Sequence, residues 1–308
     1  MPLPREFHEL AASVCNWGRW GSDDELGTLN LITPEAVLRG VASVRDGRRF
    51  SLAMRLSAAG PQIGVVPGRV NPVHLMTQVA YPDTGDPDGF CSSDDVVVMG
   101  LQAATHWDAL AHVSYGGRMW NGFPMGSVTT AGARRCGIHR VRTVVSRGVL
   151  LDVARARGVD RLEPGLALTA ADLDAAEALA GVRVEPGDVV LVRTGHVQLF
   201  LAGDRGAYAA PSPGLSTRTV PWLRARDVAA VATDTMVFEV WPPERADTVL
   251  PVHLLHVVEM GLTQGQNWVL EELGADCAAD GRYTFLLEAS PQPVLGGCGS
   301  PVNPVAVK

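Results

Sequence analysis

Hydrophobic and polar positions along the chain switch between the period typical of helices and the period typical of strands. A helical period starts at Thr33-Pro34, an N-cap followed by a first helical residue, and stops near Gly47. Further helices are expected over 169–181, 216–227 and 251–261, and strands over 48–56, 182–195, 228–235 and 282–289. Helices and strands are therefore intermixed, which indicates an α/β fold.

Two stretches do not follow either period clearly. Residues 16–34 combine tryptophans, glycines and an acidic turn, and we expect an ordered N-terminal wrap over residues 1–34. Residues 58–89 are rich in Pro, Gly, Asp and Val, which predicts a long loop or a hairpin that covers a site. The run DDVVV at 94–98 then predicts a buried strand that leads into polar residues.

Composition narrows the class of protein. The 308 residues are 46% hydrophobic and 19% charged, without a repeat or a low-complexity linker, so we expect a single domain over 1–308. The net charge of −7 gives no basic face for nucleic acid. Lys308 is the only lysine, which excludes a Schiff base or a phosphate-binding lysine inside the fold.

The sequence shows no clear membrane-spanning or secretory segment and no cysteine motif. No run reaches the length of about 18 apolar residues that a membrane span needs, and the N-terminus lacks the pattern of a secretory signal. We therefore expect a cytoplasmic protein with a small-molecule substrate and no membrane partner. The five cysteines are scattered and contain no C-x-x-C motif, so they are expected to be free thiols.

The candidate chemistry is concentrated in one short segment. Gln102, His106, Asp108 and His112 form the pattern Q-x-x-x-H-x-D-x-x-x-H. In an extended chain the first three share one face, so an amide, an imidazole and a carboxylate converge on one point. The alternative interpretation is that the two histidines are satisfied polar residues beside a core tryptophan. Spacing alone leaves both interpretations open.

This segment resembles the H-x-G-T-H-x-D-x-P-x-H signature of the cyclase family of metal-dependent hydrolases, which includes bacterial kynurenine formamidase and isatin hydrolase. The matching positions are Thr105, His106, Asp108 and His112. The sequence departs from the signature at Gln102, Ala104 and Leu110. The segments WGSDDELGTLNLITPE, PGDVVLVRTG, PVHLLHVVEMGLTQGQNWVLEEL and GSPVNP also look like family segments, so the resemblance covers most of the chain.

The resemblance implies a swivelling β/α fold with a central mixed sheet and flanking helices. It also implies a first metal set of Gln102, His106 and Asp108, a second set of His253 and Gln266, and a proton-transfer role for His112. Both departures at ligand positions are glutamines, which leaves Asp108 as the only anion. Neutral amides attract dications weakly, so we expect at most one Zn or Mn ion, or none.

The implied function is a hydrolase that opens a C–N or C–O bond, in an amide, formamide, lactam or lactone, of a small cyclic or acyl-aromatic substrate. The alternatives are a metal-independent cyclase, dehydratase or isomerase that uses His106, Asp108 and His112, and a non-catalytic binding protein. Family resemblance further implies a homo-oligomer, a dimer or tetramer. We expect three tryptophans to line the pocket: Trp17, Trp107 and Trp120. Weaker site candidates are Asp234, Glu239 and His256.

Overall fold

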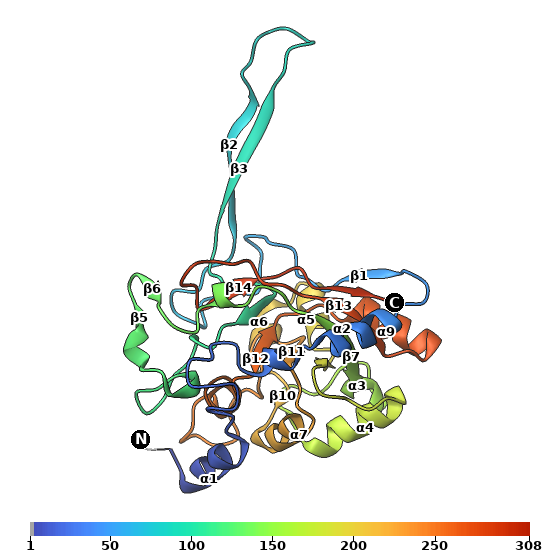
Figure 1. Cartoon of the computed structure of the whole chain (residues 1–308). Helices are drawn as coiled ribbons and strands as arrows, with labels where there is room; N and C mark the ends of the chain where they lie inside the picture. Colours follow the sequence, from blue (N-terminus) through green and yellow to red (C-terminus); the bar gives the residue numbers. More distant parts are fainter. Residues whose placement is uncertain (1–2) are drawn as a thin grey trace.

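The structure is a computed structural model that describes residues 3–308. Its centre is a mixed sheet with the strand order β1-β15-β13-β7-β9-β11-β12-β4-β14. The inner strands β7, β9, β11 and β12 are parallel, and the strands at both ends pair antiparallel. Figure 1 shows this curled sheet with helices packed around it. The strands of the sheet span Arg49–Ser51 (β1), His106–Asp108 (β4), Val145–Asp152 (β7), Val189–Arg193 (β9), Ala230–Thr233 (β11), Thr263–Gln266 (β12), Thr284–Glu288 (β13), Gly299–Pro301 (β14) and Val305–Val307 (β15).

Apolar residues cover both faces of the parallel strands, because successive side chains of a strand point to opposite faces. Val190 and Val192 belong to the apolar layer that includes α1, α4 and α7, while Val189 and Leu191 belong to the layer that includes α9. Burial on both faces agrees with the continuous apolar run that predicted this strand. The helices span Arg5–Val14 (α1), Pro34–Ala42 (α2), Val153–Ala156 (α3), Ala170–Ala180 (α4), Val197–Leu201 (α5), Arg205–Ala209 (α6), Val220–Ala225 (α7), Pro251–His253 (α8) and Glu271–Asp280 (α9).

The predicted helix starts are confirmed at two caps. The Thr33 side chain accepts a hydrogen bond from the Ala36 backbone, and Thr169 forms a capping box with Asp172. The predicted helix over 251–261 also exists, but only its first turn is α-helical, and Leu254–Met260 is a π-helix (η6) that ends at Gly261. π-Helical turns are frequent at functional sites. Single 3-10 turns span Gly27–Leu31 (η1), Trp120–Gly122 (η2), Met125–Ser127 (η3), Ile138–Arg140 (η4) and Thr217–Thr219 (η5).

One strand predicted from the sequence is present but exposed, although it was expected to be buried. Residues 94–98 were expected to be buried, but they belong to β3 (Ser92–Val98), which pairs with β2 (Val73–Tyr81) in a separate two-stranded sheet. Figure 1 shows this ribbon projecting far from the rest of the molecule. Its valines are exposed because no second layer covers either face. Of the loop or hairpin expected over 58–89, one strand, β2, lies inside these bounds, and its partner β3 lies beyond them. The remaining short strands form two small pairs, β5 (Val128–Thr129) with β6 (Gly132–Ala133) and β8 (Ala167–Leu168) with β10 (Gly214–Leu215).

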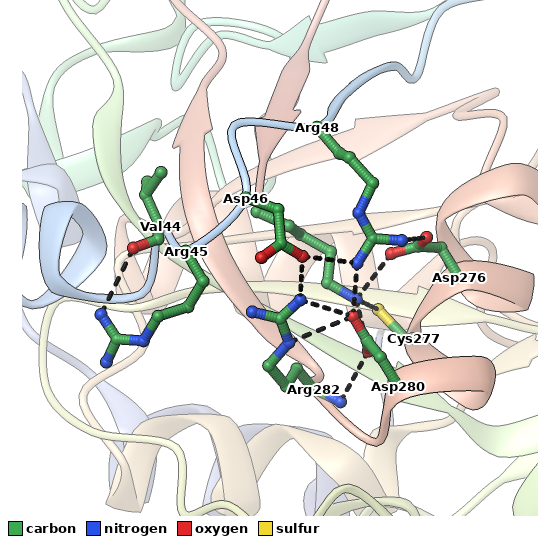
Figure 2. Close-up of polar contacts among 9 residues, drawn as sticks. Val44, Arg45, Asp46, Arg48, Asp276, Cys277, Asp280 and Arg282 are labelled. Atoms are coloured by element: carbon green, nitrogen blue, oxygen red, sulfur yellow. Dashed lines mark hydrogen bonds and ion pairs between the residues drawn. The ribbon is translucent and has the colours of Figure 1, made fainter.

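The end of the chain is fastened to the sheet beside a charged cluster. Figure 2 shows Asp46, Arg48, Asp276, Asp280 and Arg282 converging between β1 and α9. Lys308 is 1% exposed, and its ammonium pairs with both Asp276 and Asp280 at 2.8 Å. The single lysine therefore has a structural role. Among residues 3–308, no helix has the length and apolar character needed to cross a membrane.

Candidate active site

Strand β4 carries the centre of the site. It lies between β12 and β14, and its three residues are fully buried. Alternation along the strand puts His106 and Asp108 on one face and Trp107 on the other. His106 lies directly across from Gln266 on β12, so these two side chains share the same face. Three residues thus converge through strand pairing of segments about 160 positions apart.

A glycine on the opposite face makes this register possible. Trp107 packs edge-on against Trp268, with ring centroids 4.8 Å apart, and its indole N–H donates to the Ala289 carbonyl at 2.7 Å. Gly265, the cross-strand partner of Trp107, lies beneath both rings. A Cβ at Gly265 would stand 2.6 Å from the Trp268 indole nitrogen and 2.9 Å from the Trp107 ring. Only glycine therefore fits at position 265, between Gln264 and Gln266 of β12.

His106 is held with one ring nitrogen directed at Asp108. Its Nδ1 contacts the Ala104 carbonyl at 2.7 Å, which requires the proton on Nδ1. In the neutral imidazole, Nε2 then carries a lone pair toward Asp108 Oδ1, 3.4 Å away. Both atoms are buried, and neither has a hydrogen-bond partner in the part of the chain that the structure describes. Two facing acceptors repel each other unless a cation or a shared proton lies between them.

The second oxygen of Asp108 is occupied by amides. Gln266 Nε2 donates to Asp108 Oδ2 at 2.7 Å, and Gln264 Nε2 approaches the same oxygen at 3.3 Å. The Gln266 amide also lies 3.4 Å from His253 Nε2. The opposite amide orientation would place an oxygen against the carboxylate, so the NH₂ group must face Asp108. Gln266 thus bridges Asp108 and His253 with neutral N–H groups.

His253 is oriented by Glu239. Its Nδ1 lies 2.6 Å from Glu239 Oε1, and the backbone amides of Val252 and His253 donate to the same carboxylate. Because Glu239 accepts the Nδ1 proton, His253 Nε2 is left to face Gln266. Glu239 was a weak candidate from sequence, and the structure places it behind His253.

His112 is the solvent-facing member of the group. Its side chain is 20% exposed, whereas the side chains of His106 and Asp108 are 0% exposed, and its Nε2 lies 3.6 Å from Asp108 Oδ1. Burial lowers the pKa of His112, and the charge of Asp108 opposes this shift. Burial alone would raise the pKa of Asp108, but the charge of the neighbouring imidazoles, that of His112 first, outweighs burial and holds that pKa well below its ordinary range. Asp108 is therefore a carboxylate.

The other predicted site residues form no hydrogen bond with this group within residues 3–308. The Gln102 amide lies over Gly299, the cross-strand neighbour of Asp108, and within residues 3–308 it forms no hydrogen bond with His106 or Asp108. Trp107 lies in the core on the far face of β4. Trp120 is fully buried in a separate apolar cluster, and Trp17 donates to the Val258 carbonyl at 2.6 Å. A shared pocket lined by the three tryptophans stays a prediction, and Trp107 on the far face of β4 has its contacts in the core.

The two remaining candidates have structural contacts. Asp234 accepts three hydrogen bonds from Thr194 and Gly195, between 2.6 and 2.9 Å, and burial raises its pKa to about 6. His256 is fully buried beside the Phe238 ring, 5.4 Å away between centroids, and burial lowers its pKa to about 3. Neither side chain forms a hydrogen bond or an ion pair with Asp108 among the described residues.

Sequence reasoning missed Gln264 and the Ala104 carbonyl. Gln264 could have been found from the alternation in Thr263–Gln266, because Gln264 and Gln266 share one face of any strand. The role of Ala104 had no sequence signal, since any residue supplies the same backbone carbonyl.

The donor atoms can be compared with the needs of the expected ion. Within residues 3–308, no three His, Cys, Asp or Glu side chains are grouped closely enough to form a metal site by themselves. The unpartnered His106 Nε2 and Asp108 Oδ1 nevertheless provide an imidazole and a carboxylate donor that face the same space. These two atoms fit one ion that takes its other ligands from water or substrate. The space next to His253 is filled by the Gln266 amide, which does not fit a second ion.

Comparison with known proteins agrees with this architecture. Residues 50–240 match the family model "Cyclase", described as "Putative cyclase". A crystal structure of "a novel cyclase" is 38% identical, covers 97% of this chain and 99% of its own, and superposes with a TM-score of 0.88. No curated protein sequence matches the chain significantly.

More distant structures share the fold. Isatin hydrolase A from Ralstonia solanacearum is 22% identical, with 89% of this chain and 98% of that chain covered and a TM-score of 0.63. A "predicted metal-dependent hydrolase from Bacillus stearothermophilus" is 14% identical, with coverages of 85% and 99% and a TM-score of 0.54. The predicted fold class, a mixed sheet with flanking helices, is thereby confirmed.

Proposed function

This chain belongs to the Cyclase family of enzymes, and we propose that it is a hydrolase that opens a C–N or C–O bond of a small cyclic or acyl-aromatic substrate. The observation that carries the proposal is the pair of buried, unpartnered acceptors, His106 Nε2 and Asp108 Oδ1. Leaving both atoms without partners costs free energy unless a ligand of the site satisfies them. An enzyme that binds one cation there recovers that cost.

His106 and Asp108 would hold a single zinc or manganese ion. Bound there, the ion would polarise a substrate carbonyl and lower the pKa of a bound water toward 7. The Ala104 carbonyl fixes His106, and the two glutamine amides fix Asp108 Oδ2, so that Oδ1 stays directed at His106. These contacts support the orientation of both donors before substrate arrives.

His112 is suited to move the proton. Its ring is the one that reaches solvent, and its Nε2 faces Asp108 Oδ1 at 3.6 Å. His112 would take a proton from the attacking water and deliver it to the leaving nitrogen or oxygen. Asp108 stabilises the protonated form of His112 in the meantime, because its charge raises the pKa of that imidazole.

A test of this proposal measures metal content together with hydrolysis. Purified protein is stripped with a chelator, reloaded with zinc or manganese, and assayed on a panel of lactams, lactones and formanilides. We expect about one ion per chain, loss of that ion in His106→Gln and Asp108→Asn, and retention in His112→Gln. His74→Gln is the matched control, because His74 also contacts an aspartate, Asp95, but on the exposed ribbon. Absence of any stoichiometric ion after reloading would overturn the proposal.

A second candidate is supported by the Gln266 amide. Its N–H groups bridge Asp108 and His253 where a second cation would otherwise lie. The same amide donors suit a metal-independent cyclisation, dehydration or isomerisation, with His112 and Asp108 as the acid/base pair. Chelator-treated protein that keeps full turnover of its substrate would favour this reaction class.

A further inference from the structure

A network of hydrogen bonds lies behind the His106 ring nitrogen that does not face Asp108. Its last member is the Ala104 carbonyl, which accepts from His106 Nδ1 at 2.7 Å. The same carbonyl accepts from Asn267 Nδ2 at 3.2 Å, and Asn267 Oδ1 lies 2.8 Å from the Tyr208 hydroxyl. The residues His106, Asn267 and Tyr208 are all 0% exposed. Three separate segments of the chain thus form one buried network.

The direction of each hydrogen bond in this network is determined by its chemistry. A carbonyl oxygen only accepts, so the NH₂ group of Asn267 must face Ala104, and its Oδ1 must face Tyr208. The Tyr208 hydroxyl then has to donate to that oxygen. Burial raises the pKa of Tyr208 well above its ordinary value, and the charge of Asp234 acts in the same direction, so the phenol keeps its proton. Tyr208 therefore orients the Asn267 amide, and the amide donates to the Ala104 carbonyl.

The backbone of Asn267 is held in place as well. It adopts a left-handed conformation, with a φ of 60°, which asparagine tolerates better than most residues. Its N–H donates to the Thr235 carbonyl at 2.9 Å, and its own carbonyl accepts from the Thr105 hydroxyl. Thr105 is the residue that follows Ala104. Asn267 therefore contacts both residues of the peptide group whose carbonyl faces His106.

The position of this carbonyl matters because two acceptors compete for the one ring proton of a neutral His106. The Ala104 carbonyl accepts the proton at Nδ1, and the Asp108 carboxylate, 3.4 Å from Nε2, would accept it there. A hydrogen bond to a carboxylate is roughly twice as strong as one between neutral groups. A carbonyl out of position would therefore lose the proton to Asp108. A protonated Nε2 has no lone pair for a metal ion.

We propose that Asn267, itself oriented by Tyr208, is a positioning residue that keeps the His106 proton on Nδ1 and leaves the Nε2 lone pair free for the reacting site. A carbonyl oxygen has two lone pairs, so the bond from Asn267 fixes the direction of the Ala104 carbonyl while the other lone pair accepts from His106. The inference rests on the proposed function for the use of Nε2 in catalysis. The position of the proton, however, can be measured without metal or substrate.

The tautomer of His106 is measured by nitrogen NMR of isotope-labelled histidine rings in chelator-treated protein, and the His106 signals are assigned by their loss in His106→Gln. We expect the Nδ1–H tautomer in the wild type. Asn267→Gly, which tolerates the left-handed backbone, should move His106 toward the Nε2–H tautomer. Tyr208→Phe should move it in the same direction by less, because this change removes one hydroxyl and keeps the ring that packs against His196 and Phe200.

The zinc affinity of the reloaded protein gives a second measurement. It should fall about 10- to 100-fold in Asn267→Gly, the usual loss when the support of a metal-binding histidine is removed. The fall in Tyr208→Phe should be about 2- to 10-fold, the size of one neutral hydrogen bond. Asn121→Gly is the matched control for the first variant, because Asn121 is also left-handed and its amide donates to the Gly21 carbonyl. Tyr283→Phe, at another buried tyrosine, is the control for the second. Neither control should change the tautomer or the affinity.

Two results would overturn the proposal: an Nε2–H tautomer of His106 in the wild type, or an unchanged tautomer in folded Asn267→Gly and Tyr208→Phe. If Asn267→Gly does not fold, Tyr208→Phe decides by itself. The metal-free measurement keeps this outcome separate from the proposed function. A tautomer shift in a protein that binds no ion on reloading supports the positioning role and counts against metal-dependent hydrolysis. A protein that binds one ion and keeps its tautomer in both variants gives the reverse.

Discussion

Two histidine–aspartate pairs occur in β structure in this protein, and they lie in opposite environments. In the ribbon, His74 Nε2 and Asp95 Oδ2 are 2.7 Å apart, and both side chains are 58% exposed. In the sheet, His106 Nε2 and Asp108 Oδ1 are 3.4 Å apart, and both side chains are 0% exposed. Water satisfies the ribbon pair from all sides, whereas the buried pair depends on the groups that the fold and its ligands supply. The shorter distance therefore belongs to the exposed pair.

Two valine-rich strands show the same contrast. In β3, Val96, Val97 and Val98 are 41%, 47% and 59% exposed, and in β9 the run from Val189 to Val192 is 0% exposed. Both sequences favour extended backbone, because β-branched side chains fit a pleated strand. Burial follows from the neighbours: β9 lies between β7 and β11, while β3 has β2 alone. Strand propensity and burial are thus separate properties.

The largest expected effect distinguishes the buried histidine–aspartate pair from the exposed one. Asp108→Asn removes the negative charge that would bind the metal ion and that stabilises protonated His112. Turnover should therefore fall on the order of 10²- to 10⁴-fold. The double variant His106→Gln/Asp108→Asn should lose little more turnover than either single variant, because both side chains serve one centre. Asp95→Asn should leave turnover unchanged. Steady-state assays of the four proteins measure this, and additive losses in the double variant would contradict a shared centre.

The next largest effect is on stability, and it compares the buried strand β9 with the exposed strand β3. Val190→Ala should destabilise the protein by about 2 kcal/mol, because a cavity replaces two buried methyl groups in a layer that cannot close over it. Val97→Ala should change stability by less than about 0.5 kcal/mol, the usual range for exposed positions. Urea unfolding of both variants makes the comparison. A similar loss in Val97→Ala would mean that another surface covers the ribbon in solution.

Glutamines that face aspartates allow a sharper test of metal binding. Gln266 lies against Asp108 in the sheet, and Gln78 is paired with Asp94 in the ribbon. Gln266→Glu, alone and with Gln102→His, should raise zinc or manganese affinity by at least about tenfold, because it adds an anion beside Asp108 and His253. The native activity should fall, since the amide donors are lost. Gln78→Glu should bind no additional ion. Calorimetric titration distinguishes these results, and unchanged affinity in Gln266→Glu would contradict the ligand assignment.

Shortening the ribbon should have the smallest effect on the fold. Met76 and Asp95 are cross-strand partners, so residues 77–94 can be replaced by an Asn-Gly turn. The stability of the chain should change by less than about 0.5 kcal/mol, because a two-stranded hairpin adds little by itself. The same variant tests the expected homo-oligomer. Light scattering that gives a smaller assembly than the wild type would assign the ribbon to the subunit interface, and an unchanged mass would place the interface elsewhere.

The sequence by itself predicted the local elements well. The threonine caps at residues 33 and 169, the apolar run of β9, and the proline and glycine that bound the 251–261 helix are all read from neighbouring residues. The H-x-D spacing also placed His106 and Asp108 on one face, because alternation in a strand is a local rule. Sequence reasoning could not decide which strands would be covered, so residues 94–98 were expected to be buried and are not.

Tertiary structure decided the partners of the site. Gln264 and Gln266 reach Asp108 only because β12 pairs with β4. Glu239 reaches His253 only because the segment after β11 accepts hydrogen bonds from the start of α8. The physical reason is that hydrogen-bond satisfaction and desolvation are sums over neighbours in space, whereas helix caps, strand alternation and turns depend on neighbours in the chain.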